Sequence, residues 1–137
     1  MAVTTTQSSV PSPQPFVSVG VDIIEIDRVA AVIGRWDARF LQRVFTEAEL
    51  RYCRGRVPEL AARFAGKEAV TKALGTGIRG LAWREMEILP DPLGKPTVTL
   101  HGRARARAEA IGLARFAISL SHSRDYAVAM VVATSVE

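Results

Sequence analysis

The stretch RFAGKEAVTKALGTG, residues 63–77, predicts the long helix around which the fold is organised. On a helical wheel at about 100° per residue, small side chains form one stripe, made of Ala62, Gly66, Ala69 and Ala73. The other side of this helix carries the polar residues Lys67, Glu68, Thr71 and Lys72. Because the small stripe lets another backbone approach closely, we expect the helix to pack deep in the molecule with its charged face turned toward a ligand. One carboxylate beside two ammonium groups suits a metal ion together with phosphate oxygens.

A surface ion pair between Glu68 and Lys72, worth about 0.2–0.5 kcal/mol, is the competing interpretation of the charged face. The residues after the helix favour a ligand site, because Gly75, Thr76 and Gly77 begin a glycine-rich loop. An anion can approach the backbone N–H groups of such a loop without hindrance from Cβ atoms. A plain helix C-cap would need only one glycine.

Composition places the chain among globular proteins. It has 137 residues, of which 48% are hydrophobic and 23% are charged, and these values fit one domain, which we expect over residues 16–137. The formal net charge of +4 allows an anionic ligand or acidic partner without requiring one. Cys53 is the single cysteine, so no internal disulfide can form, and we expect a reducing, cytoplasmic location.

The first fifteen residues, MAVTTTQSSVPSPQP, contain no charged side chain and are rich in Thr, Ser, Pro and Gln. This composition predicts a flexible tail rather than a secretory signal, which needs a basic start and an apolar run. The longest later apolar run, residues 127–133, is too short to span a bilayer, so we expect no membrane association.

Residues 16–26, FVSVGVDIIEI, predict a buried strand that is interrupted by Asp22. An unpaired buried carboxylate costs several kcal/mol, so Asp22 needs a cation, a metal or hydrogen-bond donors beside it. It could instead cap the following helix, but Asp27 is better placed for that task. We therefore expect Asp22 to be a metal ligand.

A helix is expected from residue 27 to about residue 45, and it carries Arg28 and Arg35 seven positions apart on one face. This face is either a landing site for an acidic partner or a solvated basic surface. Thr46 and Glu49 then form a capping box that opens a short helix, and Pro58 lies in the first turn of the central helix.

The second half of the chain predicts a hairpin of residues 83–89 and 95–100, a helix over 102–112 and two strands around the sequence SLSHSRD. The overall order predicts an α+β fold in which a small antiparallel sheet packs against the long central helix. His122, flanked by serines at a strand end, is either a phosphate or ribose contact or a structural residue.

Three motifs occur in a characteristic order: GVDIIEIDR with Asp22, RFAGKEAVTKALGTGI with Glu68 and Lys72, and SLSHSRDYAVAMV with His122. FTEAEL at 45–50 and GKP at 94–96 accompany them. Together they resemble the small bacterial holo-[acyl-carrier-protein] synthases, the AcpS-type 4'-phosphopantetheinyl transferases, over about residues 17–133.

The resemblance implies transfer of the 4'-phosphopantetheine arm of coenzyme A to a serine of an acyl carrier protein, with release of adenosine 3',5'-bisphosphate. It implies that Asp22 and Glu68 hold Mg²⁺ and that Lys72 binds a phosphate oxygen, so these three are the expected catalytic residues. Lys67 is expected to steady Glu68 or to reach the nucleotide. The remaining expected coenzyme A contacts are Gly75, Thr76, Gly77, Lys95, Pro96, Ser121 and His122. The expected carrier-protein contacts are Arg28, Arg35 and Arg39.

The sequence allows alternatives for the group that accepts the serine proton, for the kind of carrier and for the class of function. The serine proton can pass to a metal-bound water or to a carboxylate, and the carrier can be a free protein or a domain of a fatty acid or polyketide synthase. A non-catalytic module that binds an acidic protein or nucleic acid would explain the arginines but not Asp22 and Glu68. We expect no nucleic-acid partner.

Association is expected because one small sheet cannot cover the apolar C-terminal strands, especially AVAMVVA at 127–133. The resemblance implies a homotrimer with its active sites between neighbouring subunits. By that analogy, Asp22 and Glu68 of one chain meet His122 of the next.

Overall fold

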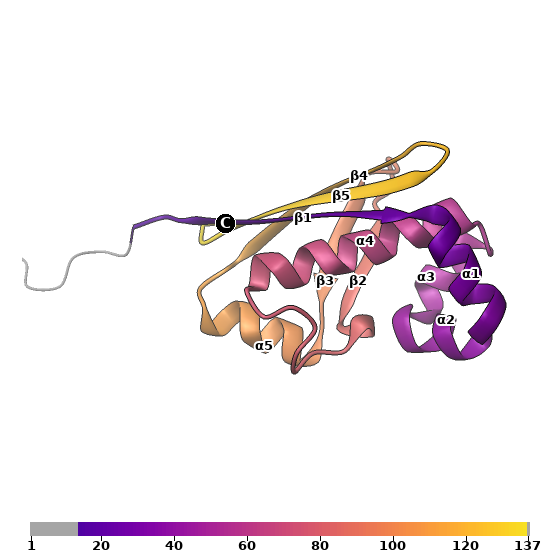
Figure 1. The fold of residues 1–137 in the computed structure, drawn as a ribbon. Coiled ribbons are helices and arrows are strands. Elements are labelled where there is room, and N and C mark those ends of the chain that lie inside the picture. The colour runs from indigo at the N-terminus through magenta and orange to yellow at the C-terminus, as the bar shows by residue number, and fades with distance from the viewer. Residues whose placement is uncertain (1–13, 137) are drawn as a thin grey trace, which may run out of the picture.

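The structure is a computed structural model that describes residues 14–136, so most of the expected N-terminal tail lies outside the described residues. Figure 1 shows the central helix lying along a three-stranded sheet, with three short helices at one end of the sheet. The elements in chain order are β1 (Val17–Glu25), α1 (Ile26–Trp36), α2 (Ala38–Val44), α3 (Glu47–Cys53), α4 (Val57–Leu74), the 3-10 turn η1 (Trp83–Glu85), β2 (Met86–Pro90), β3 (Pro96–Leu100), α5 (Gly102–Ala110), β4 (Arg115–His122) and β5 (Tyr126–Thr134).

The small stripe of α4 lies in the core, as expected from the sequence. Ala69 and Ala73 are buried where α4 crosses β1, and a Cβ atom on Gly20 of β1 would collide with the backbone oxygen of Ala69. On the neighbouring side of the helix, a Cβ atom on Gly66 would lie 2.5 Å from Cδ1 of Ile88. The backbone of α4 therefore approaches the strands more closely than larger residues would allow.

The main sheet is antiparallel in the order β1-β5-β4, and β2 and β3 form a separate antiparallel hairpin. One row of the main sheet places Asp22 opposite Ala129, which in turn lies opposite Leu120. Because side chains alternate along a strand, this row and every second residue face α4. The small antiparallel sheet on a long helix confirms the α+β expectation.

The expectation of a buried strand over residues 16–26 is wrong for one face of β1. This strand is at the edge of the sheet, and its second face leaves Val17, Val19, Val21 and Ile23 between 56% and 64% exposed. Residues 17–23 do alternate, but the small and polar residues Ser18, Gly20 and Asp22 are the ones that face α4. The usual pattern of apolar residues inward and polar residues outward is therefore reversed, and the sequence did not show that the apolar face is the uncovered one.

The expected helix from residue 27 to residue 45 is also corrected. It breaks at Asp37, whose φ of 47° ends α1 and redirects the chain into α2. Asp27 lies in the first turn of α1 and is not its N-cap, because Glu25 occupies that position without a side-chain hydrogen bond. The Thr46–Glu49 capping box and the place of Pro58 in the first turn of α4 are confirmed.

The hairpin expected after the glycine loop is confirmed, with Gly94 at a φ of 91° in its turn. Its first three residues, 83–85, form the η1 turn rather than strand. Across residues 14–136, no helix combines the length and apolar character needed to cross a bilayer.

Candidate active site

Asp22 and Glu68 line the same hollow, which has a volume of about 370 Å³. Asp22 reaches it from the α4-facing side of β1, and Glu68 reaches it from α4 itself. Apolar side chains and one arginine form the rest of the lining: Ile23, Ile24, Arg28, Val29, Val32, Phe40 and Phe64. Two carboxylates remote in sequence thus meet in a small hollow with largely apolar walls.

Lys72 lies on the β1 side of this pair. Its Nζ donates to the backbone oxygen of Val21 at 2.9 Å and lies 3.2 Å from Oδ1 of Asp22. Half of the Lys72 side chain is exposed, and an ammonium group has three donors, so the geometry leaves a donor for an anionic ligand.

The pKa of Glu68 is raised above the ordinary value of 4.5. Partial burial is the main cause, the nearby charge of Asp22 adds to it, and Lys72 opposes both. A carboxylate whose ionisation is disfavoured beside a second carboxylate forms a site that a cation would stabilise.

The donor set fits Mg²⁺ better than a metal that needs an all-protein shell. In the part of the chain that the structure describes, no group of three or more His, Cys, Asp or Glu side chains could hold a metal ion. Mg²⁺ is typically held by one or two carboxylates and completes its shell with water and substrate phosphates. Asp22 and Glu68 are two carboxylates that could hold such an ion.

The expectation that Lys67 steadies Glu68 or reaches a nucleotide is wrong. Lys67 is fully buried, and its Nζ lies 2.8 Å from Oε1 of the equally buried Glu49. The same ammonium donates to the backbone oxygens of Trp83 at 3.1 Å and Met86 at 2.7 Å. Burial lowers the pKa of Lys67, and the Glu49 carboxylate counteracts this effect. Since neighbouring helix residues point about 100° apart, Lys67 faces the β2 side while Glu68 faces the hollow.

Thr71, placed with the charged residues by the helical wheel, is buried as well, and its hydroxyl donates to the backbone oxygen of Glu68.

The glycine loop begins where α4 ends, with Gly75 at a φ of 79° and Gly77 at 61°. Both glycines are exposed, and Thr76 Oγ1 donates to the backbone oxygen of Gly77. These loop residues do not line the hollow that holds the carboxylates.

The other expected coenzyme A contacts also lie outside that hollow. Lys95 and Pro96 are at the turn of the β2–β3 hairpin, and Ser121 and His122 end β4. His122 on β4 lies in the same row of the sheet as Ala127 on β5 and Ile24 on β1. Because β4 is two strands away from β1, His122 and Ile24 are separated by about 10 Å across the sheet. One chain therefore brings together Asp22, Glu68 and Lys72, but it does not place the His122 group in the same hollow.

Arg28, Arg35 and Arg39 lie on one side of the hollow. Arg28 lines the hollow together with Asp22 and Glu68, whereas its spacing with Arg35 indicated only that the two arginines share a helix face. Arg35 and Arg39 flank the indole ring of Trp36, with guanidinium carbons 5.4 and 5.6 Å from the ring centroid. The basic surface thus begins at the hollow and continues along α1 to the start of α2.

The aromatic walls of the hollow, Phe40 and Phe64, were not identified from the sequence. Their rings lie 6.0 Å apart, and Phe64 also packs against Trp83 at 5.2 Å. Their positions on α2 and α4 fit ordinary core residues, so only the packing of these two helices shows that they border the carboxylates.

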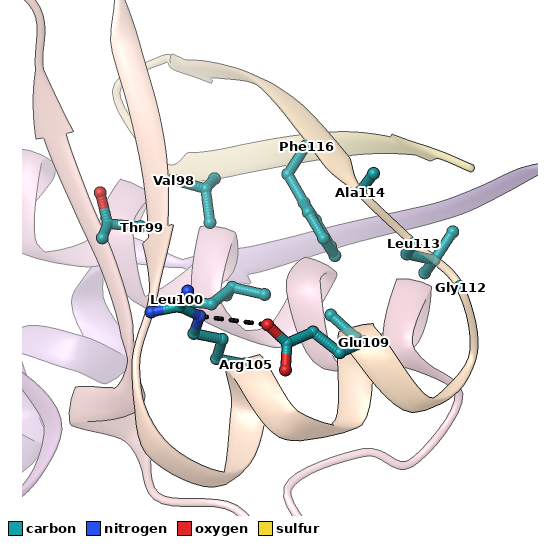
Figure 2. Close-up of a pocket in the computed structure, with 10 residues that line it drawn as sticks. Val98, Thr99, Leu100, Arg105, Glu109, Gly112, Leu113, Ala114 and Phe116 are labelled. Carbon is teal, nitrogen blue, oxygen red and sulfur yellow. Dashed lines mark hydrogen bonds and ion pairs between the residues drawn. The ribbon is translucent and has the colours of Figure 1, made fainter. Parts of the chain in front are cut away.

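A larger hollow of about 630 Å³ lies between β3, α5 and β4, and Figure 2 shows its lining. Its two charged residues, Arg105 and Glu109, pair with each other at 3.3 Å, as the dashed line in Figure 2 marks. None of the expected site residues lines it. The smaller hollow with the carboxylates is therefore the better candidate for chemistry.

Comparisons with known proteins show which family the chain resembles. The family model described as the 4'-phosphopantetheinyl transferase superfamily matches residues 18–131. A holo-[acyl-carrier-protein] synthase of Herpetosiphon aurantiacus is 50% identical over 120 residues, which cover 82% of this chain and 94% of the relative. A protein of the same name from Dehalococcoides mccartyi is 53% identical over 114 residues, with 83% and 95% covered.

Solved structures give the same result. The Helicobacter pylori holo-[acyl-carrier-protein] synthase in complex with coenzyme A has a TM-score of 0.78 at 30% identity, covering 84% of this chain and 98% of that chain. The Neisseria meningitidis synthase has a TM-score of 0.79 at 36% identity, with 85% and 96% covered.

Proposed function

The chain belongs to the 4'-phosphopantetheinyl transferase superfamily and is a transferase; from this premise we propose that it modifies an acyl carrier protein. The proposed reaction moves the 4'-phosphopantetheine arm of coenzyme A to a serine of the apo carrier and releases adenosine 3',5'-bisphosphate. The observation that carries the proposal is that Asp22 and Glu68 line one hollow and that the ammonium of Lys72 lies beside Asp22.

Phosphoryl transfer depends mainly on positioning and on neutralising charge, which is what this arrangement can provide. Asp22 and Glu68 would hold Mg²⁺, and a bound Mg²⁺ would supply positive charge that offsets the negative charge of phosphate oxygens. The half-exposed ammonium of Lys72 would hold a phosphate oxygen and offset negative charge on the departing nucleotide. The apolar walls of Phe40 and Phe64 limit water beside the reacting groups.

Binding of coenzyme A is assigned to groups that one chain keeps apart. His122 and Ser121, the Gly75–Gly77 loop and the Lys95–Pro96 turn would contact the nucleotide end. The exposed apolar face of the sheet supports a homotrimer in which these groups and the carboxylates come from neighbouring chains. It carries Val17, Val19, Val21, Ile23 and Met130, each between 53% and 64% exposed.

The carrier protein would approach over Arg28, Arg35 and Arg39, which suit an acidic surface. Arg28 borders Asp22 and Glu68, so a carrier docked there would bring its serine to the reacting groups.

The decisive experiment is mass spectrometry of an apo carrier protein incubated with coenzyme A, Mg²⁺ and this protein. We expect the carrier to gain the mass of one phosphopantetheine and adenosine 3',5'-bisphosphate to appear in equal amount. Omitting the enzyme, or adding excess chelator, should leave the carrier unmodified. A carrier that stays unmodified with all components present contradicts the proposed function.

A further inference from the structure

A large aromatic side chain is left in solvent at the end of α1. Trp36 is 47% exposed, and the guanidinium groups of Arg35 and Arg39 stack over its ring. The chain turns sharply just after it, at Asp37, whose backbone N–H donates to the oxygen of Ile33 at 2.6 Å. The indole therefore lies at the corner between α1 and α2, next to two cations.

Trp36 borders a hollow of about 380 Å³ whose lining is Val32, Trp36, Arg39, Phe40 and Arg43. Val32 and Phe40 also line the hollow that holds Asp22 and Glu68. The two hollows therefore adjoin, with Val32 and Phe40 forming the floor between them. A shallow groove runs from the carboxylates to the indole.

The groove is apolar along its floor and basic along its rim. Arg28 stands at the carboxylate end, and Arg39 and Arg43 stand at the Trp36 end. Such a surface suits an acidic protein with an apolar segment, because the rim attracts its charges while the floor accepts its side chains. Under the proposed function, a carrier that brings its serine to Asp22 and Glu68 must cover the adjoining groove.

We propose that Trp36 is the apolar anchor for the carrier protein and so a specificity-determining residue of this enzyme. This inference rests on the proposed function, and it adds an apolar contact to the charged contacts already assigned. Tryptophan and arginine are the residue types that most often dominate the energy of an interface, particularly near its centre. An indole gives a large contact area at small conformational cost, since it has only two rotatable side-chain bonds.

The test compares Trp36→Ala with Phe16→Ala, which removes an aromatic ring of similar exposure, 45%, outside both hollows. We expect Trp36→Ala to raise the KM for apo carrier about 10- to 30-fold, the size of effect found at interface hot spots. The KM for coenzyme A and the melting temperature should stay at wild-type values. Trp36→Phe should retain most of the carrier affinity, and Phe16→Ala should leave the KM for carrier unchanged.

Salt dependence separates an apolar anchor from a further charged contact. The KM of Trp36→Ala for carrier should rise with salt as steeply as that of the wild type, because no charge has been removed. A carrier KM within twofold of the wild-type value overturns the proposal. So does an equal rise in the KM values for carrier and coenzyme A, since that indicates general damage to the site.

Calorimetric binding of apo carrier, without coenzyme A, distinguishes failure of this inference from failure of the proposed function. A wild-type chain that binds carrier more tightly than Trp36→Ala, but does not modify it, supports the anchor and contradicts the proposed reaction. If Trp36→Ala binds and modifies the carrier as well as the wild type does, only the anchor is contradicted. A wild-type chain that neither binds nor modifies carrier overturns both.

Discussion

At the scale of single residues, neighbours in sequence have opposite tasks in this protein. Lys67 and Glu68 are adjacent on α4, yet Lys67 is paired with Glu49 in the core while Glu68 faces the hollow with Asp22. Removing one partner of a buried ion pair costs about 3–5 kcal/mol because it leaves an uncompensated charge. Lys67 thus contributes to the stability of the fold, and we propose that the chemistry depends on Glu68 and Asp22.

Glu68→Gln and Asp22→Asn should each abolish most transfer without unfolding the protein. Each change removes one negative charge from the proposed metal site at nearly constant volume. Groups that only support metal ligands cost about 10- to 100-fold when removed, so we expect a loss in kcat/KM at or above the upper end of that range. Steady-state kinetics with the melting temperature as a control checks this, and wild-type rates at ordinary Mg²⁺ would contradict the metal-site assignment.

The raised pKa of Glu68 predicts how stability depends on pH in the absence of divalent cations. The folded state binds this proton more tightly than the unfolded chain does, so the free energy of unfolding falls as the pH rises from about 4.5 through the folded pKa. Glu68→Gln has no such titration. Its melting temperature should therefore exceed that of the wild type at pH 7 and approach it near pH 4.

Adding Mg²⁺ at pH 7 should reverse this order by raising the wild-type melting temperature more than that of Glu68→Gln. Thermal unfolding at both pH values, with and without Mg²⁺, provides the measurement. A variant that is no more stable than the wild type at pH 7 without metal would show that Glu68 is not destabilised in the folded state.

At the scale of elements, contact between backbones holds the site together. Gly20 lets β1 lie directly against α4, and this contact places Asp22 within reach of Lys72, one turn beyond Glu68. The site is thus built on a strand and a helix rather than on loops. Elements packed this closely hold their side chains in one relative position.

Gly20→Ala should destabilise the protein by about 1–3 kcal/mol or more, because the added methyl group collides with the backbone of Ala69. Gly34→Ala in α1 is the matched control, since nothing lies within 4 Å of its added Cβ atom. An alanine in a helix interior is favoured over glycine by about 1 kcal/mol, so this control should be slightly more stable than the wild type. Urea unfolding of both variants tests the contact, and equal effects would contradict it.

The exposed face of α1 makes a prediction about the partner. Arg35→Glu should raise the KM for carrier protein and flatten its dependence on salt, because a long-range attraction becomes a repulsion. The KM for coenzyme A should change little. Kinetics at two salt concentrations checks this, and an unchanged carrier KM would identify the face as a solvated surface.

At the scale of the whole molecule, the described chain leaves one face of the sheet uncovered and keeps His122 outside the hollow with the carboxylates. The side of the sheet turned away from α4 exposes a continuous set of β-branched residues on β1, together with Met130 of β5. His122 lies on the α4-facing side of the sheet, two strands away from Asp22 and outside its hollow. Association through the apolar face would cover the exposed side of the sheet. We propose that it also brings His122 of one chain to the carboxylates of another.

Complementation tests the shared site. Asp22→Asn and His122→Ala proteins, each weakly active, are denatured together, refolded and assayed. In mixed trimers some sites would combine an intact carboxylate side with an intact histidine side, so activity should rise well above that of either parent. Native mass spectrometry confirms mixing, and activity at the parental average in mixed trimers would place the whole site within one chain.

The sequence by itself determined most of the elements of this protein and indicated its family. Small residues at helical spacing indicated that α4 would be buried, Thr46 and Glu49 identified the start of α3, and Gly94 marked the hairpin turn. These features depend on local backbone geometry, which is readable from residue type and spacing. The motifs around Asp22, Glu68 and His122 likewise sufficed to indicate the family, which the comparisons confirmed.

Only the tertiary structure decided which face of each element meets protein and which meets solvent. The helical period gives the directions in which Lys67, Glu68 and Lys72 point relative to one another. It does not show that the Lys67 side packs against Glu49 and the backbone of β2. The alternating valines of β1 do not reveal that the face they form lacks a cover within the described residues 14–136. The groove from Asp22 to Trp36 also depends on the angle at Asp37, because Phe40 and Val32 meet only once α1 and α2 are packed together.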